Sequence, residues 1–123
     1  MEIFKCEVCG NVVDLLFNGG GTLVCCGQDM TKMIVNQDET VYEKHIPVLE
    51  INDNEIKVQV GEVLHPTEEK HYIEWIAMIT SKGVIRKNFQ PGESPVMTFS
   101  KIDEDFNIYA YCNIHGLFQG KVK

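Results

Sequence analysis

The clearest hydrophobic pattern in this chain of 123 residues has a period of two. In the segment 56–60, IKVQV, apolar and polar residues alternate, which predicts a strand with one buried face. The segment 71–79, HYIEWIAMI, is rich in β-branched and aromatic residues and predicts a longer strand. Further strands are expected over 96–100 and 106–111.

Turn signals separate these strands. They lie at NDN (52–54), KG (82–83) and QPGE (90–93), and helical periodicity is not sustained anywhere in the sequence. Short strands with a turn signal roughly every 8–12 residues predict an antiparallel β-sandwich, here over residues 37–123, with a linker at 37–40.

Residues 1–36 form a second predicted unit, which has too few apolar residues to build a core of its own. Units below about 40 residues usually need a metal or disulfides to fold. Two cysteine pairs, each followed by a glycine that suits a tight turn (Gly10 and Gly27), are expected to face each other there.

The composition argues against two classes of binding partner, nucleic acids and membranes. Apolar residues make up 44% and charged residues 24%, which is typical of a globular protein, and 18 acidic against 11 basic residues give a net charge of −7. Such a chain repels phosphates and anionic lipids, so we expect neither a nucleic acid nor a membrane partner. No apolar run approaches the roughly 18–20 residues that cross a bilayer.

The five cysteines change the picture further. The first residues show no basic segment followed by an apolar one, so we expect a cytoplasmic protein. In a reducing compartment, clustered cysteines more often bind metal or do redox chemistry than form disulfides.

The first candidate metal group contains Cys6, Cys9, Cys25 and Cys26. The C-x-x-C spacing lets one turn direct two sulfurs at the same ion, and four thiolates suit iron or zinc. The alternatives are a structural zinc ribbon and two unrelated cysteine pairs. The spacing does not decide between iron and zinc.

The second candidate group collects all four histidines and the fifth cysteine: His45, His65, His71, Cys112 and His115. Cys112 and His115 have two residues between them, which suits a loop that holds one ion. His65 and His71 are expected at the two ends of one loop, from which both could reach that ion. The simpler interpretation is that each is an ordinary surface histidine or buried cysteine.

Five protein ligands exceed the four of structural zinc and leave a sixth position for a small oxygen ligand. A thiolate opposite that position would push electron density toward the metal, as in thiolate-ligated haem, which suits redox catalysis. Three alternatives stay open: a blue copper site, although no Met follows Cys112; an iron electron carrier without catalysis; and a zinc protein with a β interaction domain.

Glu43 and Lys44 directly precede His45. A lysine near an open metal position would attract an anionic substrate despite the overall negative charge. A nearby carboxylate would serve as a removable oxygen ligand. Otherwise the two residues are a solvated charge pair.

Together these motifs resemble the desulfoferrodoxin family of two-iron superoxide reductases, nearly from end to end. The motifs are CEVCG at 6–10, GGGTLVCCG at 19–27, EKHIP at 43–47, HP at 65–66, HYIEW at 71–75 and CNIHG at 112–116.

The resemblance implies a mainly β protein, with a desulforedoxin-like module that binds one iron through the four cysteines. It implies an immunoglobulin-like antiparallel β-sandwich that binds a second iron, with the four histidines equatorial and Cys112 axial. The implied reaction is the one-electron reduction of superoxide to hydrogen peroxide. Lys44 would attract superoxide and assist protonation, and Glu43 would ligate the oxidised iron. The implied partners are rubredoxin or a similar electron donor and a second copy in a homodimer.

Overall fold

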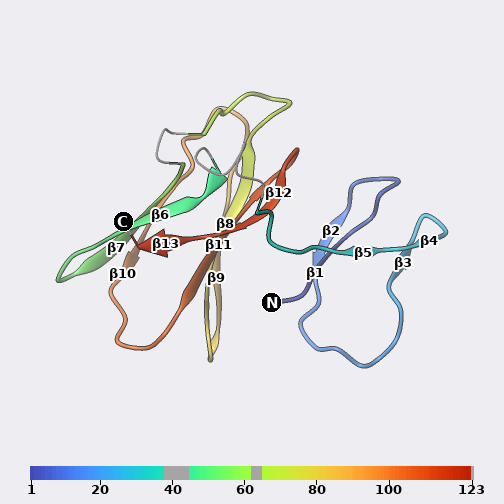
Figure 1. Ribbon diagram of the computed structural model, residues 1–123, viewed down its shortest axis with the longest axis horizontal. Helices are drawn as coiled ribbons and strands as arrows, with labels where there is room; N and C mark the ends of the chain where they lie inside the picture. Colours follow the sequence, from blue (N-terminus) through green and yellow to red (C-terminus); the bar gives the residue numbers. More distant parts are fainter. Residues whose placement is uncertain (38–44, 62–64, 123) are drawn as a thin grey trace. The chain divides into compact units, whose positions relative to one another are not determined.

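The computed structural model describes residues 1–37, 45–61 and 65–122 (Figure 1). The chain divides into two compact units, Met1–Ile34 and Val35–Lys123. The boundary expected from the sequence lies two residues further along, after residue 36. Val35 forms a parallel bridge with Leu117, and the Asn36 N–H donates to the Leu117 carbonyl at 2.7 Å, so both residues pair within the second unit.

The first unit consists of short strands. Its three-stranded antiparallel sheet has the order β2-β1-β5, from β1 (Ile3–Lys5), β2 (Val12–Asp14) and β5 (Thr31–Lys32). A separate hairpin joins β3 (Val24–Cys25) to β4 (Gln28–Asp29). Its buried apolar side chains are few, namely Ile3 and Cys6 among the described residues.

The second unit contains two four-stranded sheets. The first has the order β10-β7-β6-β13, from β6 (Pro47–Ile51), β7 (Glu55–Val60), β10 (Val96–Ser100) and β13 (Lys121–Val122). The second has the order β12-β11-β8-β9, from β8 (Ile73–Thr80), β9 (Gly83–Asn88), β11 (Asn107–Cys112) and β12 (Gly116–Gln119).

One apolar core joins the two sheets. Ile56, Val58 and Val60 of β7 contribute their buried face, and Met78 and Ile108 contribute from the other sheet. The period-two pattern therefore identified the correct buried face. The predicted mainly β fold, a small cysteine module followed by a β-sandwich, is confirmed.

Two features of the sheets differ from the sequence prediction. β13 pairs with β6 in parallel, so the first sheet is mixed rather than wholly antiparallel. β9 was not predicted, because all six of its residues are exposed and the hydrophobic pattern carries no signal there.

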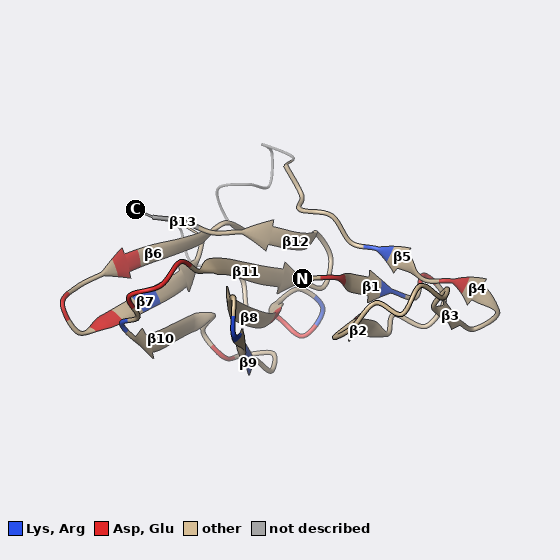
Figure 2. Ribbon diagram, turned by 90° about the horizontal axis from the view of Figure 1, so that it is seen from below, with Lys and Arg blue, Asp and Glu red and all other residues tan. Residues whose placement is uncertain are grey.

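β9 carries basic residues (Figure 2), and the side chains of two of them contact aromatic rings. Arg86 lies over the ring of Trp75 at 6.0 Å, and Lys87 lies over Phe89 at 5.1 Å. The contact of Arg86 with Trp75 joins β9 to β8 and adds to the backbone pairing of these two strands. In the described part of the chain, no helix has the length and apolar character required to cross a membrane.

Candidate metal centres

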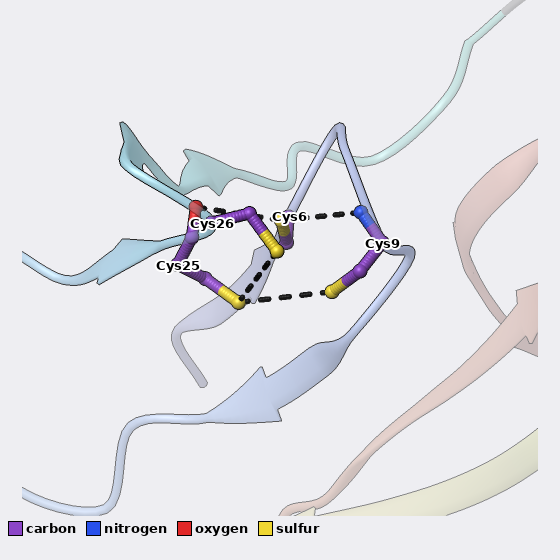
Figure 3. A group of neighbouring side chains, drawn as sticks. All are labelled: Cys6, Cys9, Cys25 and Cys26. Atoms are coloured by element: carbon purple, nitrogen blue, oxygen red, sulfur yellow. Dashed lines mark hydrogen bonds between the residues drawn. The ribbon is translucent and has the colours of Figure 1, made fainter.

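The four cysteines of the first unit lie together (Figure 3). The Cys9 and Cys25 sulfurs are 3.7 Å apart, and the Cys25 and Cys26 sulfurs are 3.9 Å apart. Four sulfurs at about 2.3 Å from one ion in a tetrahedron are about 3.8 Å apart. A disulfide would need about 2.0 Å, and all four cysteines are free.

Tight turns place these sulfurs. After Cys6, the Gly10 N–H donates to the Cys6 carbonyl at 2.9 Å, and Gly10 has a φ of 83°. At the second pair, Cys26 has a φ of 52° and Gly27 a φ of 75°. The positive φ of Cys26 is uncommon for a residue with a side chain. It lets two adjacent cysteines direct their sulfurs into one group.

The thiols differ in acidity. The Cys9 N–H donates to the Cys6 sulfur at 3.4 Å and lowers the pKa of the Cys6 thiol to about 6. Hydrogen bonding to the Cys9 and Cys25 sulfurs raises the pKa of Cys26 to about 12, and contact with Cys6 raises the pKa of Cys25. Ligands bind as thiolates, so a metal that enters this group displaces protons.

The second group lies in the other unit. His45, His65, His71 and Cys112 each offer one donor atom, and these atoms lie within 4.8 Å of one another. His115 lies beside them, since its Nδ1 is 3.0 Å from Nε2 of His45 and 3.8 Å from the Cys112 sulfur. The structure therefore brings together all five side chains of the second predicted group.

The spacing of the nitrogens indicates the geometry. Nε2 of His45 is 2.9 Å from Nε2 of His65 and 3.0 Å from Nδ1 of His115. Two nitrogens at about 2.1 Å from one ion are about 3.0 Å apart at a right angle and about 3.4 Å apart in a tetrahedron. The observed values match neighbouring positions in a square or octahedral set.

Hydrogen bonding fixes the tautomer of His65. Its Nδ1 donates to the Pro66 carbonyl at 2.7 Å, and burial lowers the pKa of the ring to about 4. Nε2 of this neutral ring therefore carries a lone pair, which is directed at the group. This arrangement orients a ligand histidine in many metal sites.

His71 is held differently. Among the described residues its buried Nε2 has no hydrogen-bond partner, and burial lowers the ring pKa. A buried nitrogen without a partner is costly, and a metal ion would satisfy it.

A β-bulge interrupts the pairing of β8 with β11 next to Cys112. On β11 and β8, Tyr111 pairs with Trp75, but the next residue, Cys112, pairs with Ile73. Glu74 is the extra residue, and it changes which side of the strand faces inward. Bulges re-aim side chains in this way next to functional sites.

Cys112 is fully buried at the end of β11, and burial raises the pKa of its thiol. Its sulfur lies 3.5 Å from Nε2 of His65. A thiol buried in this way loses its proton only when a nearby cation compensates the negative charge of the thiolate.

Two asparagines near this group were missed by the sequence analysis. Asn113 bonds to residues on both sides of His71, and the Asn36 side chain donates to the His115 carbonyl at 2.8 Å. The sequence analysis looked for cysteine and histidine ligands, and asparagine is neither. The position of Asn113 inside the CNIHG motif was the available signal.

Glu43 and Lys44 lie outside the described residues, so the structure does not place their side chains.

Comparison with known proteins identifies the family. The model described as "Desulfoferrodoxin" matches residues 37–121, and the one described as "Desulfoferrodoxin, N-terminal domain" matches residues 1–33. The chain belongs to the desulfoferrodoxin family. A desulfoferrodoxin homolog of Archaeoglobus fulgidus is 48% identical over 119 residues, covering 97% of this chain and 95% of the relative.

Other relatives match the whole chain or one unit of it. The superoxide reductase structure from Treponema pallidum is similar with a TM-score of 0.75 at 31% identity, covering 98% of this chain and 96% of that one. Desulforedoxin of Megalodesulfovibrio gigas is 64% identical over 31 residues, which is 25% of this chain and 84% of desulforedoxin.

Both donor groups fit iron, the metal expected from the desulfoferrodoxin resemblance. Four thiolates in a tetrahedron bind iron, and imidazoles with one thiolate also do so. The expected iron cofactors, one for each group, are confirmed. The chain is an oxidoreductase.

Proposed function

We propose that this chain reduces superoxide to hydrogen peroxide at the second group, consuming one electron and two protons for each superoxide. The observation that carries the proposal is a fully buried Cys112 sulfur among imidazole nitrogens at right-angle spacing. The fold of the Treponema pallidum superoxide reductase supports it.

The proposed ligands of the second iron are Nε2 of His45, His65 and His71, Nδ1 of His115, and the Cys112 sulfur. The proposed ligands of the first iron are the four cysteines. Five protein donors leave one of six positions for superoxide. These residues would hold a ferrous ion, which would supply the electron.

The chain's own residues prepare this site. Burial and the Pro66 carbonyl keep His65 neutral with Nε2 free to bind, and burial keeps His71 neutral. The apolar core around Cys112 excludes water from its sulfur.

We also propose roles for Lys44 and Glu43, which rest on their positions in the sequence alone. Lys44 directly precedes His45, and in a chain of net charge −7 a local cation would raise the concentration of superoxide at the site. It would also orient a water that donates a proton to the product. Glu43 would occupy the open position after oxidation.

The wider setting is also a proposal. Rubredoxin or a similar small protein would supply electrons, the protein would act as a homodimer, and its role would be superoxide detoxification in the cytoplasm. Five free cysteines support a reducing compartment.

The deciding experiment mixes the reduced, iron-loaded protein with superoxide without oxygen and counts products. Reduction yields one hydrogen peroxide per superoxide and no dioxygen. Dismutation would yield half as much peroxide together with dioxygen, and a pure electron carrier would give no rapid reaction. Either of these results would overturn the proposal.

Two variants test the assigned roles. Cys112→Ser should abolish the thiolate-to-iron absorption band of the second site, because the only sulfur donor of that group is gone, while the absorption of the four-cysteine group stays. Lys44→Ala should slow superoxide capture at low ionic strength while iron stays bound, whereas Lys82→Ala, at an exposed turn, should not. Equal rates for both lysine variants would exclude the steering role.

A further inference from the structure

Asn113 binds the chain on both sides of His71. Its Oδ1 accepts from the Tyr72 N–H at 3.0 Å, and its Nδ2 donates to the Lys70 carbonyl at 3.0 Å. Its own backbone N–H donates to the Tyr72 carbonyl at 3.2 Å. These three hydrogen bonds link the residue that follows Cys112 to the two neighbours of His71.

We propose that Asn113 is a positioning residue that fixes His71 relative to Cys112 and so keeps the second iron in place. The inference rests on the ligand set of the proposed function. It adds a residue that neither binds the metal nor touches the substrate.

The side chain suits this role because an amide both donates and accepts. The segment that carries His71 presents an N–H at Tyr72 and a carbonyl at Lys70, and one primary amide satisfies both. Aspartate has the same shape but lacks the donor, and alanine lacks both groups. Asn113 therefore continues the β11–β8 pairing beyond Cys112, where the regular strands end.

His71 needs such support more than its neighbours do. His65 is oriented through its own ring by the Pro66 carbonyl. In contrast, Nε2 of His71 has no hydrogen-bond partner in the described part of the chain, and the residue as a whole is only half-buried. Its direction thus depends on its backbone, which pairs with Glu68, and on the flanking residues Lys70 and Tyr72, which bond to Asn113. Loss of such supporting contacts typically lowers metal affinity by 10–100-fold.

The test measures the release of iron from the loaded protein to a chelator, without superoxide. We expect Asn113→Ala to release the second iron about 10–100-fold faster than the unmodified chain, and Asn113→Asp to fall between them. Asn107→Ala is the matched control, since Asn107 is an exposed asparagine on the same strand that bonds only to Gln119 in the described contacts. The thiolate-to-iron band should also shift in Asn113→Ala, which a loss of stability alone would not cause.

Double variants show whether Asn113 acts through His71 or by a general loss of stability. In His71→Ala, the further change Asn113→Ala should add little to the release rate, because the residue it positions is absent. In His65→Ala it should retain its effect. An unchanged release rate and band in Asn113→Ala, or the same factor in both histidine backgrounds, would overturn the proposal. Since no superoxide is used, the result is independent of whether the reaction is the proposed one.

Discussion

Nε2 of His45 and Nε2 of His65 lie 2.9 Å apart, although His65 has its proton on the opposite ring nitrogen. Nε2 of His45 also lies 3.0 Å from Nδ1 of His115, so one proton on His45 can serve only one of these two contacts. A cation at the centre satisfies all three nitrogens at once. The site is therefore arranged for a metal rather than for internal hydrogen bonding.

The metal-free protein should become less stable as the pH falls. The ordinary histidine pKa is about 6.5, and burial lowers that of His65 to about 4. Between these values the unfolded chain binds more protons than the folded chain. Stability is thus complete above about pH 6.5 and declines as the pH falls toward 4. His71, also shifted downward by burial, adds to the decline.

Urea midpoints of the metal-free protein at pH 7, 5.5 and 4.5 would measure this decline. His65→Gln removes the titrating ring and should flatten the profile. An equally steep profile in that variant would assign the pH dependence to other groups.

Removal of iron should affect the two units unequally. Apart from Cys6, the first unit buries only Ile3 among its described apolar residues, so its fold depends on the metal. The second unit has an apolar core from both sheets, including Ile76 and Phe118. After chelation, we expect amide protection to be lost in residues 1–34 and largely kept in β7, β8 and β11, as measured by hydrogen exchange. Persistent protection in both units would show that the first does not require its ion.

Asn36→Ala should weaken the second site from the His115 side. The Asn36 amide donates to the His115 carbonyl at 2.8 Å, so its loss frees the turn that carries Nδ1 of His115. We expect iron release about 10-fold faster. Asn52→Ala serves as the control, because Asn52 stabilises a remote turn through bonds to Asn54 and Glu55. Equal release rates in the two variants would argue against this role.

Gly120→Ala should destabilise the second unit by about 1–3 kcal/mol. A Cβ at this position would lie 3.0 Å from Cδ1 of Leu49 and 3.1 Å from the Pro47 carbonyl, between β12 and β13. Gly21→Ala, where a Cβ meets nothing within 4 Å, should leave the unfolding midpoint nearly unchanged. Similar midpoints in the two variants would show that Leu49 moves aside without cost.

The sequence predicted the buried face of β7 and the two metal groups, because these depend on local alternation and on residue types with specific chemistry. The strand over 96–100 coincides with β10, and the turn at Asn52 is present. The longer strand begins at Ile73 rather than at His71, because His71 is engaged in the turn to Glu68.

Other features could not be predicted from local pattern. The bulge at Glu74 arises from pairing between β8 and β11, whose paired residues are 28 to 39 positions apart in the sequence. The parallel pairing of β13 with β6 likewise joins the two ends of the second unit. Asn113 and Asn36 act through the backbone of distant residues, so their roles emerge only once the sheets are assembled.

The two metal groups also differ in how much of the chain each requires. The cysteines of the first lie between positions 6 and 26, whereas His45 and His115 of the second are separated by 70 positions. Synthesis proceeds from the N-terminus, and early domains can fold before later ones are made. The first group can therefore capture metal while the second is still missing ligands. In the growing chain, the cysteine group is thus complete before Cys112 and His115, the last donors of the second group, are made.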